Sequence, residues 1–307
     1  MAFEITAYQM GIFFVILLAG FILGKLGFFK QESMASFAGI ITRVLLPALI
    51  IHNTVASTTR DMVFSNWPVV VFGFVFYAIM PVIMFGIAKL LRLPGDRDRV
   101  FTFCFTFGNT GFIGIPLLSA LFPDYGLLFM ALFSIADQLC FWTYGVQLST
   151  ARDRGAHMHL KDLISPNTVA LVIAFIFVFA DCPLPGFVND VLGTLANATS
   201  ALCMMYLGLM LCFSRWKSVL KMKELYVGIA VKMFVLPILV GHLLLLTGLP
   251  QDMMTCMVII CSLPVMTVVP MLVRMHGDEG DYAAGITVVT LVVSVVTIPL
   301  VQLIAFA

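Results

Sequence analysis

The sequence predicts an all-α polytopic membrane protein of about ten transmembrane helices, arranged as two inverted five-helix repeats. Composition is the first reason, because 61% of the 307 residues are hydrophobic, 11% are charged, and the mean hydropathy is +1.08. A soluble domain is nearer half apolar and a quarter charged. Second, short polar segments separate apolar runs of about 20 residues, the length that spans a bilayer as a helix. Third, the two halves of the chain align on each other.

Ten apolar runs are long enough to be transmembrane helices. In chain order the predicted spans are 8–29, 34–57, 67–92, 99–122, 126–149, 165–181, 186–212, 224–247, 252–275 and 281–304. Little sequence remains between them, so no separate soluble domain is expected. Five spans fall in residues 1–150 and five in residues 151–307, which are the two predicted repeats.

The distribution of basic residues predicts the orientation in the membrane. With the N-terminus outside, the inner loops and helix ends hold Lys25, Lys30, Lys89, Arg92, Arg97, Arg99, Arg152, Arg154, Lys161, Arg215, Lys217, Lys221, Lys223 and Arg274. The outer loops hold Arg60 alone. Because short cytoplasmic loops are rich in Lys and Arg, both termini are expected outside a plasma or inner membrane. The net charge of +1 argues against a nucleic-acid partner.

An offset of 154 residues aligns the two halves. It lays FGNTGFIGIPLL (107–118) on CSLPVMTVVPML (261–272) and places Pro116 on Pro270. Since 154 is half the chain and five is half of ten spans, the second half is expected to cross the membrane in the opposite sense. Inverted repeats of this kind recur in secondary transporters.

The fourth and ninth spans are expected to be broken helices. The residues expected to produce the breaks are Gly108, Gly111, Gly114, Pro116, Pro264 and Pro270. Broken backbone is tolerated in lipid only where protein or water satisfies its polar groups. Paired breaks at matching places therefore predict a binding site near the midplane, where half-helix N-termini suit an anionic ligand. Packing and kinking are the structural alternative for each glycine and proline.

Polar side chains near these breaks are the candidate substrate-binding residues. Asn109 is the most informative, because an amide at membrane depth needs partners: it binds ligand or caps the freed backbone. Thr110 and Gly111 follow it directly in the fourth span, and Ser262 and Thr267 lie near the prolines of the ninth.

Charged groups at membrane depth form a second set of candidates. Asp137 lies about halfway along the fifth span, where a carboxylate is costly unless it is protonated, paired or hydrated. It is a candidate site for proton or cation coupling, or it forms a structural ion pair with Arg43 or Lys232. Gln138 is a further coupling candidate that points about 100° away on the helix. Arg43 binds a substrate carboxylate or pairs with Asp137, and Lys232 is expected to extend to the inner surface.

Neither a cofactor nor a metal site is predicted. The seven cysteines form no C-x-x-C motif, and six of them lie in apolar runs. An intramembrane enzyme is disfavoured because H-E-x-x-H, G-x-S-x-G and a second intramembrane carboxylate to partner Asp137 are all missing from the sequence. A channel or a membrane sensor of the same fold stays open as an alternative.

Four segments resemble the auxin efflux carrier family. They are GNTGFIGIPLL in the fourth span, WTYG (142–145) in the fifth, the proline-broken ninth span, and TLVVSVVTIPLVQLI in the last. The resemblance covers essentially the whole chain. It implies a scaffold domain and a transport domain, with helices four and nine crossing at their breaks and carrying substrate in an elevator-like cycle. By position, the crossover asparagine is Asn109 and the paired prolines are Pro116 and Pro270.

The resemblance also indicates a substrate class. The short loop ARDRGAHMHLKDLI replaces the long hydrophilic loop of plant members, which favours the prokaryotic-type branch and mono- or dicarboxylates such as malate over auxin. The expected partners are a small organic anion, a proton as coupling ion, the lipid bilayer and a candidate homodimer. Sodium is the alternative coupling ion, because the related bile-acid symporter fold uses it, although no second intramembrane carboxylate favours it.

Overall fold

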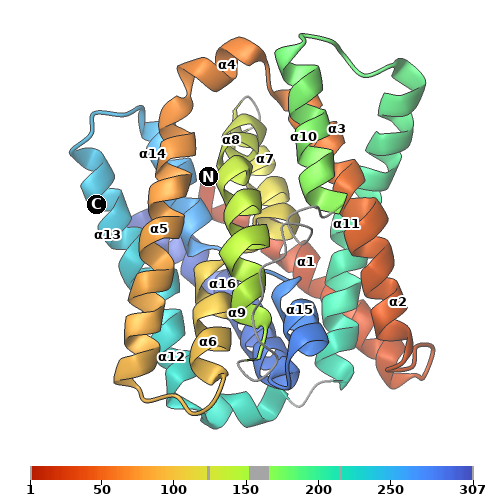
Figure 1. The fold of residues 1–307 in the computed structure, drawn as a ribbon, viewed down its shortest axis with the longest axis vertical. Helices are drawn as coiled ribbons and strands as arrows, with labels where there is room; N and C mark the ends of the chain where they lie inside the picture. Colours follow the sequence, from red (N-terminus) through yellow and green to blue (C-terminus); the bar gives the residue numbers. More distant parts are fainter. Residues whose placement is uncertain (1, 123–124, 152–165, 214–215, 306–307) are drawn as a thin grey trace.

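The computed structural model describes residues 2–122, 125–151, 166–213 and 216–305, and its named elements are all helices (Figure 1). Within these described ranges, six helices are long and apolar enough to cross a membrane, and three shorter apolar helices accompany them. All six begin and end within a few residues of predicted spans. The chain is therefore an all-helical polytopic membrane protein, as predicted, whereas the count of ten spans and their inverted pairing stay predictions. Most of the loop ARDRGAHMHLKDLI lies outside the described residues.

Within each described range, the helices follow one another with short connections. Those of the first half are α1 (Ala2–Lys25), α2 (Ser33–Ile40), η1 (Ile41–Leu45), α3 (Leu46–Ser57), α4 (Arg60–Ser65), α5 (Trp67–Leu90), α6 (Arg97–Thr106), η2 (Thr110–Gly114), α7 (Ile115–Leu121), α8 (Gly126–Cys140), η3 (Phe141–Gly145) and α9 (Val146–Ser149). Those of the second half are α10 (Pro166–Phe179), α11 (Gly186–Phe213), η6 (Trp216–Lys221), α12 (Lys223–Ala230), η7 (Val231–Val235), α13 (Leu236–Leu245), α14 (Gln251–Ser262), α15 (Val269–His276) and α16 (Gly280–Ile304).

Prolines explain three of the single π-helical turns. Each of η1, η2 and η7 ends two residues before a proline, and these prolines are Pro47, Pro116 and Pro237. Proline has no N–H to donate, and its ring clashes with the carbonyl four residues earlier in a regular α-helix. Widening the preceding turn relieves that clash, so the helix continues with a local bulge. Such bulges leave carbonyl groups available for other partners.

Apolar side chains cover the outside of the molecule, as a lipid-facing surface requires. On α5, for example, Val71, Ile79 and Val82 are about half exposed or more, whereas Tyr77 and Met84 on the opposite side are buried. Together with Val75, which is 49% exposed, the exposed residues are spaced by three and four, the spacing of one helix face. A soluble protein rarely exposes so continuous an apolar surface. The buried face of α5 packs against α6 and α8.

Small residues allow the closest contact between long helices. A Cβ atom on Gly20 of α1 would lie 2.2 Å from the carbonyl oxygen of Met205, and one on Gly208 of α11 would lie 2.0 Å from that of Leu17. The two backbones are therefore in contact. Membrane helices associate through such close packing, because lipid tails are as apolar as the helices and no hydrophobic driving force brings the helices together. Besides this pair, α3 packs on α10 and α11, which joins α1, α3, α10 and α11 into one group.

The fourth and ninth predicted spans are broken, as the sequence predicts. The fourth consists of α6, an extended link, η2 and α7, and the ninth consists of α14, an extended link and α15. In Figure 1, α6 and α15 lie in the lower half of the molecule and α7 and α14 in the upper half, so the links lie near mid-height. The arrangement brings two unwound backbones into the interior, where they need hydrogen-bonding partners.

Candidate functional site

The two extended links cross and pair with each other. Gly108 and Val265 form an isolated antiparallel β-bridge. The N–H of Asn109 donates to the carbonyl of Pro264 over 2.8 Å, and the N–H of Met266 donates to the carbonyl of Phe107 over 3.1 Å. Each break thus satisfies backbone groups of the other, which answers the requirement that unwound backbone in lipid must find partners.

Glycine allows close approach where the links touch. A Cβ atom on Gly108 would lie 3.2 Å from Cβ of Leu263, tighter than an ordinary contact. Gly114 lies one turn further along, and its added Cβ would lie 3.0 Å from both Leu263 and Met130. Glycine at these places admits the neighbouring segment, a packing role that the sequence also allowed.

The prolines occupy two different kinds of position. Pro264 lies in the extended link itself, and its carbonyl is the acceptor described above. Pro270 lies instead in the first turn of α15, where a proline loses no internal hydrogen bond. Pro116 lies at the start of α7, which continues η2 without a gap, so its effect is the widened turn described above. The second half-helices therefore begin at Thr110 and Val269.

Asn109 joins the two breaks through its side chain. Its Oδ1 accepts from the N–H of Phe112 over 3.3 Å and caps η2, while its Nδ2 donates to Oγ1 of Thr267 over 2.7 Å. The side chain is buried, with 1% of its surface exposed. Capping is thus present in this structure, and the second proton of Nδ2 stays available for another acceptor. Ser262, by contrast, donates to the carbonyl of Ile259 in its own helix over 2.8 Å.

Asp137 lies behind the first break, completely buried. One carboxylate oxygen accepts from the hydroxyl of Tyr77, and the other accepts from Oγ1 of Thr110 over 2.9 Å. The ring of Tyr77 stacks on Phe107, the first residue of the link, with ring centroids 5.0 Å apart. The carboxyl group is therefore hydrogen-bonded to Thr110, a residue of the first break. The amino-acid sequence alone does not indicate that Tyr77 is its partner.

Lys232 lies behind the second break, and its predicted extension to the inner surface is wrong. Its side chain is 1% exposed, and Nζ donates to the carbonyl of Leu263, where α14 ends. That carbonyl belongs to the C-terminal end of a helix, which carries partial negative charge. The ammonium also lies close to the first break, since a Cβ atom on Gly108 would lie 3.6 Å from Nζ. Lys232 lies on the buried face of η7, which turns it inward.

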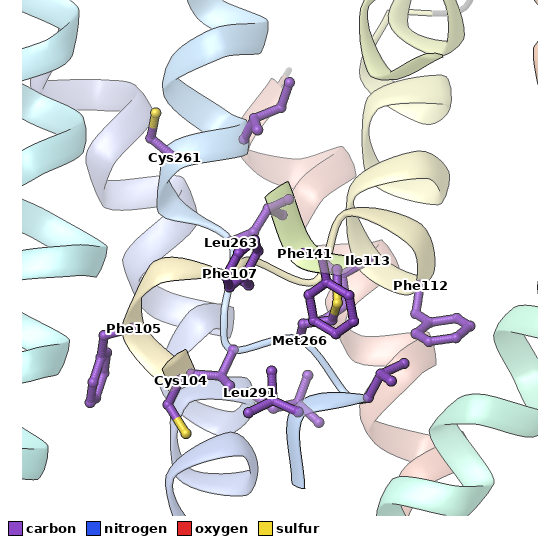
Figure 2. Close-up of a cluster of buried hydrophobic side chains, with 14 of the residues drawn as sticks. Cys104, Phe105, Phe107, Phe112, Ile113, Phe141, Cys261, Leu263, Met266 and Leu291 are labelled. Atoms are coloured by element: carbon purple, nitrogen blue, oxygen red, sulfur yellow. The ribbon is translucent and has the colours of Figure 1, made fainter. Parts of the chain in front are cut away.

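The second break has one more polar partner that sequence reasoning missed. Oγ1 of Thr290 on α16 accepts from the N–H of Val265 over 3.2 Å and donates to the carbonyl of Thr287 over 3.0 Å. Apolar side chains surround the crossing otherwise: Figure 2 shows Phe107, Leu263, Met266 and Phe141 gathered around the two links. The crossing is thus a small polar core inside an apolar shell.

A small cavity opens beside the first break, with a volume of about 30 Å³. Its lining residues are Leu46, Ile50, Asn109, Thr110, Gly111, Phe112, Gln138, Phe141, Trp142, Asn167, Met266 and Val268. One wall comes from the crossing with η3 and the end of α8, and the other from α3 and α10. Because a single water needs roughly 10–15 Å³ of such volume, the cavity in this state has room for only about two or three waters.

The candidate residues divide between this cavity and its surroundings. Gln138 lines the cavity, and its Oε1 accepts from Nε1 of Trp142 over 3.0 Å. Asp137, the preceding residue, is turned away from the cavity toward Tyr77, as the expected angle of about 100° implies. Arg43 is exposed on η1, one turn before the lining residue Leu46, and it does not pair with the buried Asp137, which was one of its two predicted roles.

A larger cavity of about 370 Å³ lies elsewhere, at the lower end of the molecule in Figure 1. Its lining comes from the turn at Gly95 and Asp96, the end of α9 and the connection between α15 and α16. An ion pair between Arg97 and Glu279, 3.0 Å long, closes part of the same region. Its volume exceeds that of the cavity beside the first break, but the broken helices and buried charges lie at the smaller cavity.

Comparison with known proteins yields one family and several relatives. The family described as "Membrane transport protein" matches residues 7–160 and 155–302. An uncharacterized transporter of Methanocaldococcus jannaschii is 27% identical over 208 residues, covering 64% of this chain and 66% of the relative. One of Methanothermobacter thermautotrophicus is 25% identical over 203 residues, covering 65% and 66%. One of Schizosaccharomyces pombe is 25% identical over 153 residues, covering 44% and 34%. The alignments thus span just under two thirds of the archaeal relatives.

Proposed function

Because the chain belongs to the membrane transport protein family, which is the auxin efflux carrier family, we propose that it is a secondary active transporter of small organic anions. Substrate binds in the cavity beside the crossing of the two broken helices. The observation that carries this proposal is the meeting of unwound backbone, polar side chains and a cavity at one buried place. Such a combination is the usual binding site of secondary transporters.

The polar groups of the cavity suit an anion. The N–H of Gly111 lies in the first turn of η2, where a helix has no internal acceptor for it. Gln138 offers its NH₂ group, since its oxygen is held by Trp142. Lys232 adds a buried positive charge just behind Gly108, with Nζ 3.6 Å from where a Cβ of that glycine would lie. Donors and the positive end of a helix together favour negative charge.

Asp137 couples the anion to a proton. Thr110 contacts both the cavity and the carboxyl group, so substrate and Asp137 lie on two sides of one hydroxyl. Two unit negative charges roughly 6 Å apart repel by about 3 kcal/mol at an effective dielectric constant near 20. Protonating Asp137 removes this repulsion and strengthens anion binding by about 100-fold. Substrate and proton therefore bind together and cross together, as in symport.

Sodium coupling and a channel are the alternatives. A sodium site needs several oxygen ligands around the cation, but at the second break the ammonium of Lys232 already binds the carbonyl of Leu263. A fixed lysine is an internal cation there, which favours the proton as coupling ion. A channel needs a continuous pore, whereas the cavity volume is about 30 Å³. A carrier that opens to each side in turn fits this closed cavity.

The wider arrangement is part of the proposal. Elements that carry many basic residues, among them η6, the start of α6 and the end of α15, lie at the lower end in Figure 1, and α4 with Arg60 lies at the upper end. This asymmetry supports an inner lower end with both termini outside. The group α1, α3, α10 and α11 acts as scaffold, and the crossing with its flanking helices acts as the transport domain of two inverted repeats.

The test is counterflow in proteoliposomes with labelled malate, malonate, lactate and indole-3-acetate, with and without a pH gradient. A carrier shows uptake stimulated by unlabelled substrate on the opposite side, and a channel does not. Uptake should rise when the side that supplies substrate is acidified. Sodium gradients should have no effect.

The proton role is tested with Asp137→Asn. This variant keeps both hydrogen-bonding neighbours but cannot ionise, so counterflow should persist while stimulation by the pH gradient disappears. Asp181→Asn, in the exposed connection between α10 and α11, is the matched control. Unchanged pH stimulation in Asp137→Asn would remove the coupling role from this residue.

A further inference from the structure

Asn167 is a buried polar residue of the cavity that the crossing does not explain. It lies in the first turn of α10, and 4% of its surface is exposed. Its side chain lines the cavity, and its Oδ1 has no hydrogen-bond partner among the described residues. Buried amide oxygens are nearly always paired, because leaving one unpaired is costly. A cavity is where such an atom finds its partner in a ligand.

The rest of the cavity supplies a different chemistry from Asn167. On the crossing side, Gly111 and Gln138 present N–H groups, which suit the carboxylate of a substrate. On the α10 side, Asn167 presents an acceptor. The two sides therefore contact two different groups of one ligand: an anionic oxygen on one side and a hydrogen-bond donor on the other.

We infer that Asn167 is a specificity-determining residue that accepts a hydrogen bond from a substrate hydroxyl, so that small hydroxy carboxylates are preferred over acids lacking that hydroxyl. This inference rests on the proposed transport of organic anions and names the substrate class of that same site. Asn167 positions no catalytic group and takes no part in proton coupling, because Asp137 lies on the opposite side of Thr110.

Two features of the site favour a hydroxyl over other donors. An ammonium group, as in an amino acid, is disfavoured because Asn167 lies at the N-terminal end of α10, where the helix carries partial positive charge. An indole N–H is disfavoured by size, since a cavity of about 30 Å³ must widen far more for a bicyclic ring than for a three- or four-carbon acid. A neutral hydroxyl on a short chain satisfies both conditions.

The experiment compares acids that differ only in a hydroxyl group. Lactate and propionate form one pair, malate and succinate the other, and each competes with labelled substrate in proteoliposomes. In the wild-type protein the hydroxy acid should compete about tenfold better, the effect of one neutral hydrogen bond in a desolvated site. In Asn167→Leu, which has similar volume but no acceptor, that advantage should vanish because the hydroxy acid weakens, while the unsubstituted acid is unchanged or improved.

Controls separate specificity from folding. Asn197→Leu is the same change at an exposed position of α11, and it should keep the wild-type preference. Thermal unfolding of each purified variant, with and without lactate, shows whether it is folded and binds. Should Asn167→Leu prove unstable, the smaller Asn167→Ala gives the same comparison without introducing a branched side chain.

Each outcome decides the matter. A preference retained in Asn167→Leu, or absent from the wild type although acids are transported, overturns the role of Asn167 and leaves the transport proposal standing. The wild type could instead prefer indole-3-acetate to phenylacetate, with a preference that depends on Asn167. That result would show that Oδ1 of Asn167 accepts from a ring N–H, and it would overturn the proposed preference for hydroxy acids. Neither transport nor stabilisation by any acid means that the transport proposal itself fails, and this inference with it.

Discussion

The two breaks at the crossing have paired backbones but opposite chemistry. The first carries polar side chains, Asn109 and Thr110, and a carboxyl group, Asp137, attaches to it. The second has apolar side chains in its link, and an ammonium group, Lys232, attaches to it. The backbone geometry that lets two helices cross therefore does not decide what each break binds. The side chains from neighbouring helices decide it.

The groups at the two breaks lie at matching positions in the two halves of the chain. The 154-residue offset places Tyr77 on residue 231, next to Lys232, and Asp137 on residue 291, next to Thr290. At corresponding places, the first break therefore has the carboxyl group of Asp137 and the phenol of Tyr77. The second break has the amine of Lys232 and the hydroxyl of Thr290. We infer that the first break binds substrate and proton, while the second holds a fixed cation that keeps the crossing neutral enough to be buried.

The largest effect is expected from removing the cation of the second break. Lys232→Met leaves the carbonyl of Leu263 unpaired and Asp137 without its opposite charge. Transport should be lost, and the unfolding temperature measured on the purified protein should fall. Adding Asp137→Asn to that variant should recover part of the lost stability.

Lys89→Met, at the exposed end of α5, is the control for this change and should behave as wild type. If Lys232→Met were to transport and unfold like the wild-type protein, the second break would need no cation, and the proposed contrast between the breaks would be lost.

An intermediate effect is expected at the side chain that joins the breaks. Asn109→Ala removes the cap of η2, worth about 1–2 kcal/mol of stability, and with it a substrate donor. Uptake at subsaturating substrate should fall at least about tenfold, the value of one good hydrogen bond to a charged acceptor, while the protein stays folded.

Thr267→Val serves as the partial variant, because it removes only the acceptor of the Asn109 amide and should lose less uptake. Near-normal uptake by Asn109→Ala would remove the crossing as the binding site, whatever the variant does to the unfolding temperature.

The smallest effect is expected from a neutral hydrogen bond of the second break. Thr290→Val leaves the N–H of Val265 unpaired and should cost about 1–3 kcal/mol of stability. Substrate affinity and the response to a pH gradient should not change, because this hydroxyl contacts neither the cavity nor Asp137. The control is Thr194→Val on the exposed side of α11. A changed pH response in Thr290→Val would show that proton coupling extends to the second break.

Local sequence signals predicted the breaks and the buried acid well. Glycine and proline act on the backbone within a few residues, so GNTGFIGIP could be placed at a break without knowing its neighbours. Asp137 could be identified because depth along a span is counted directly from its ends. Both signals depend only on positions along the chain, so they do not require knowledge of how the helices pack.

Signals that depend on helix rotation and on partners could not be obtained in the same way. Lys232 and Arg43 lie at similar depths, yet the first is buried and the second exposed, because each helix turns a different face to the interior. Tyr77 and Thr290 lie in apolar runs and reveal a role only through long-range contacts. Asn167 carried one readable signal, an amide in the first turn of a predicted span, but its unpaired oxygen is visible only in the folded protein.

The bridge between Gly108 and Val265 also constrains how the protein moves. Separating the two links would break two N–H···O bonds with no water to replace them, at about 4–6 kcal/mol each in an apolar medium. Together this is about 10 kcal/mol, which would slow each turnover by roughly 10⁷-fold. We therefore propose that the crossed links move through the transport cycle as one rigid body. On this proposal the sliding surface lies across the cavity, where Leu46 and Ile50 contribute apolar contacts that re-form at each step.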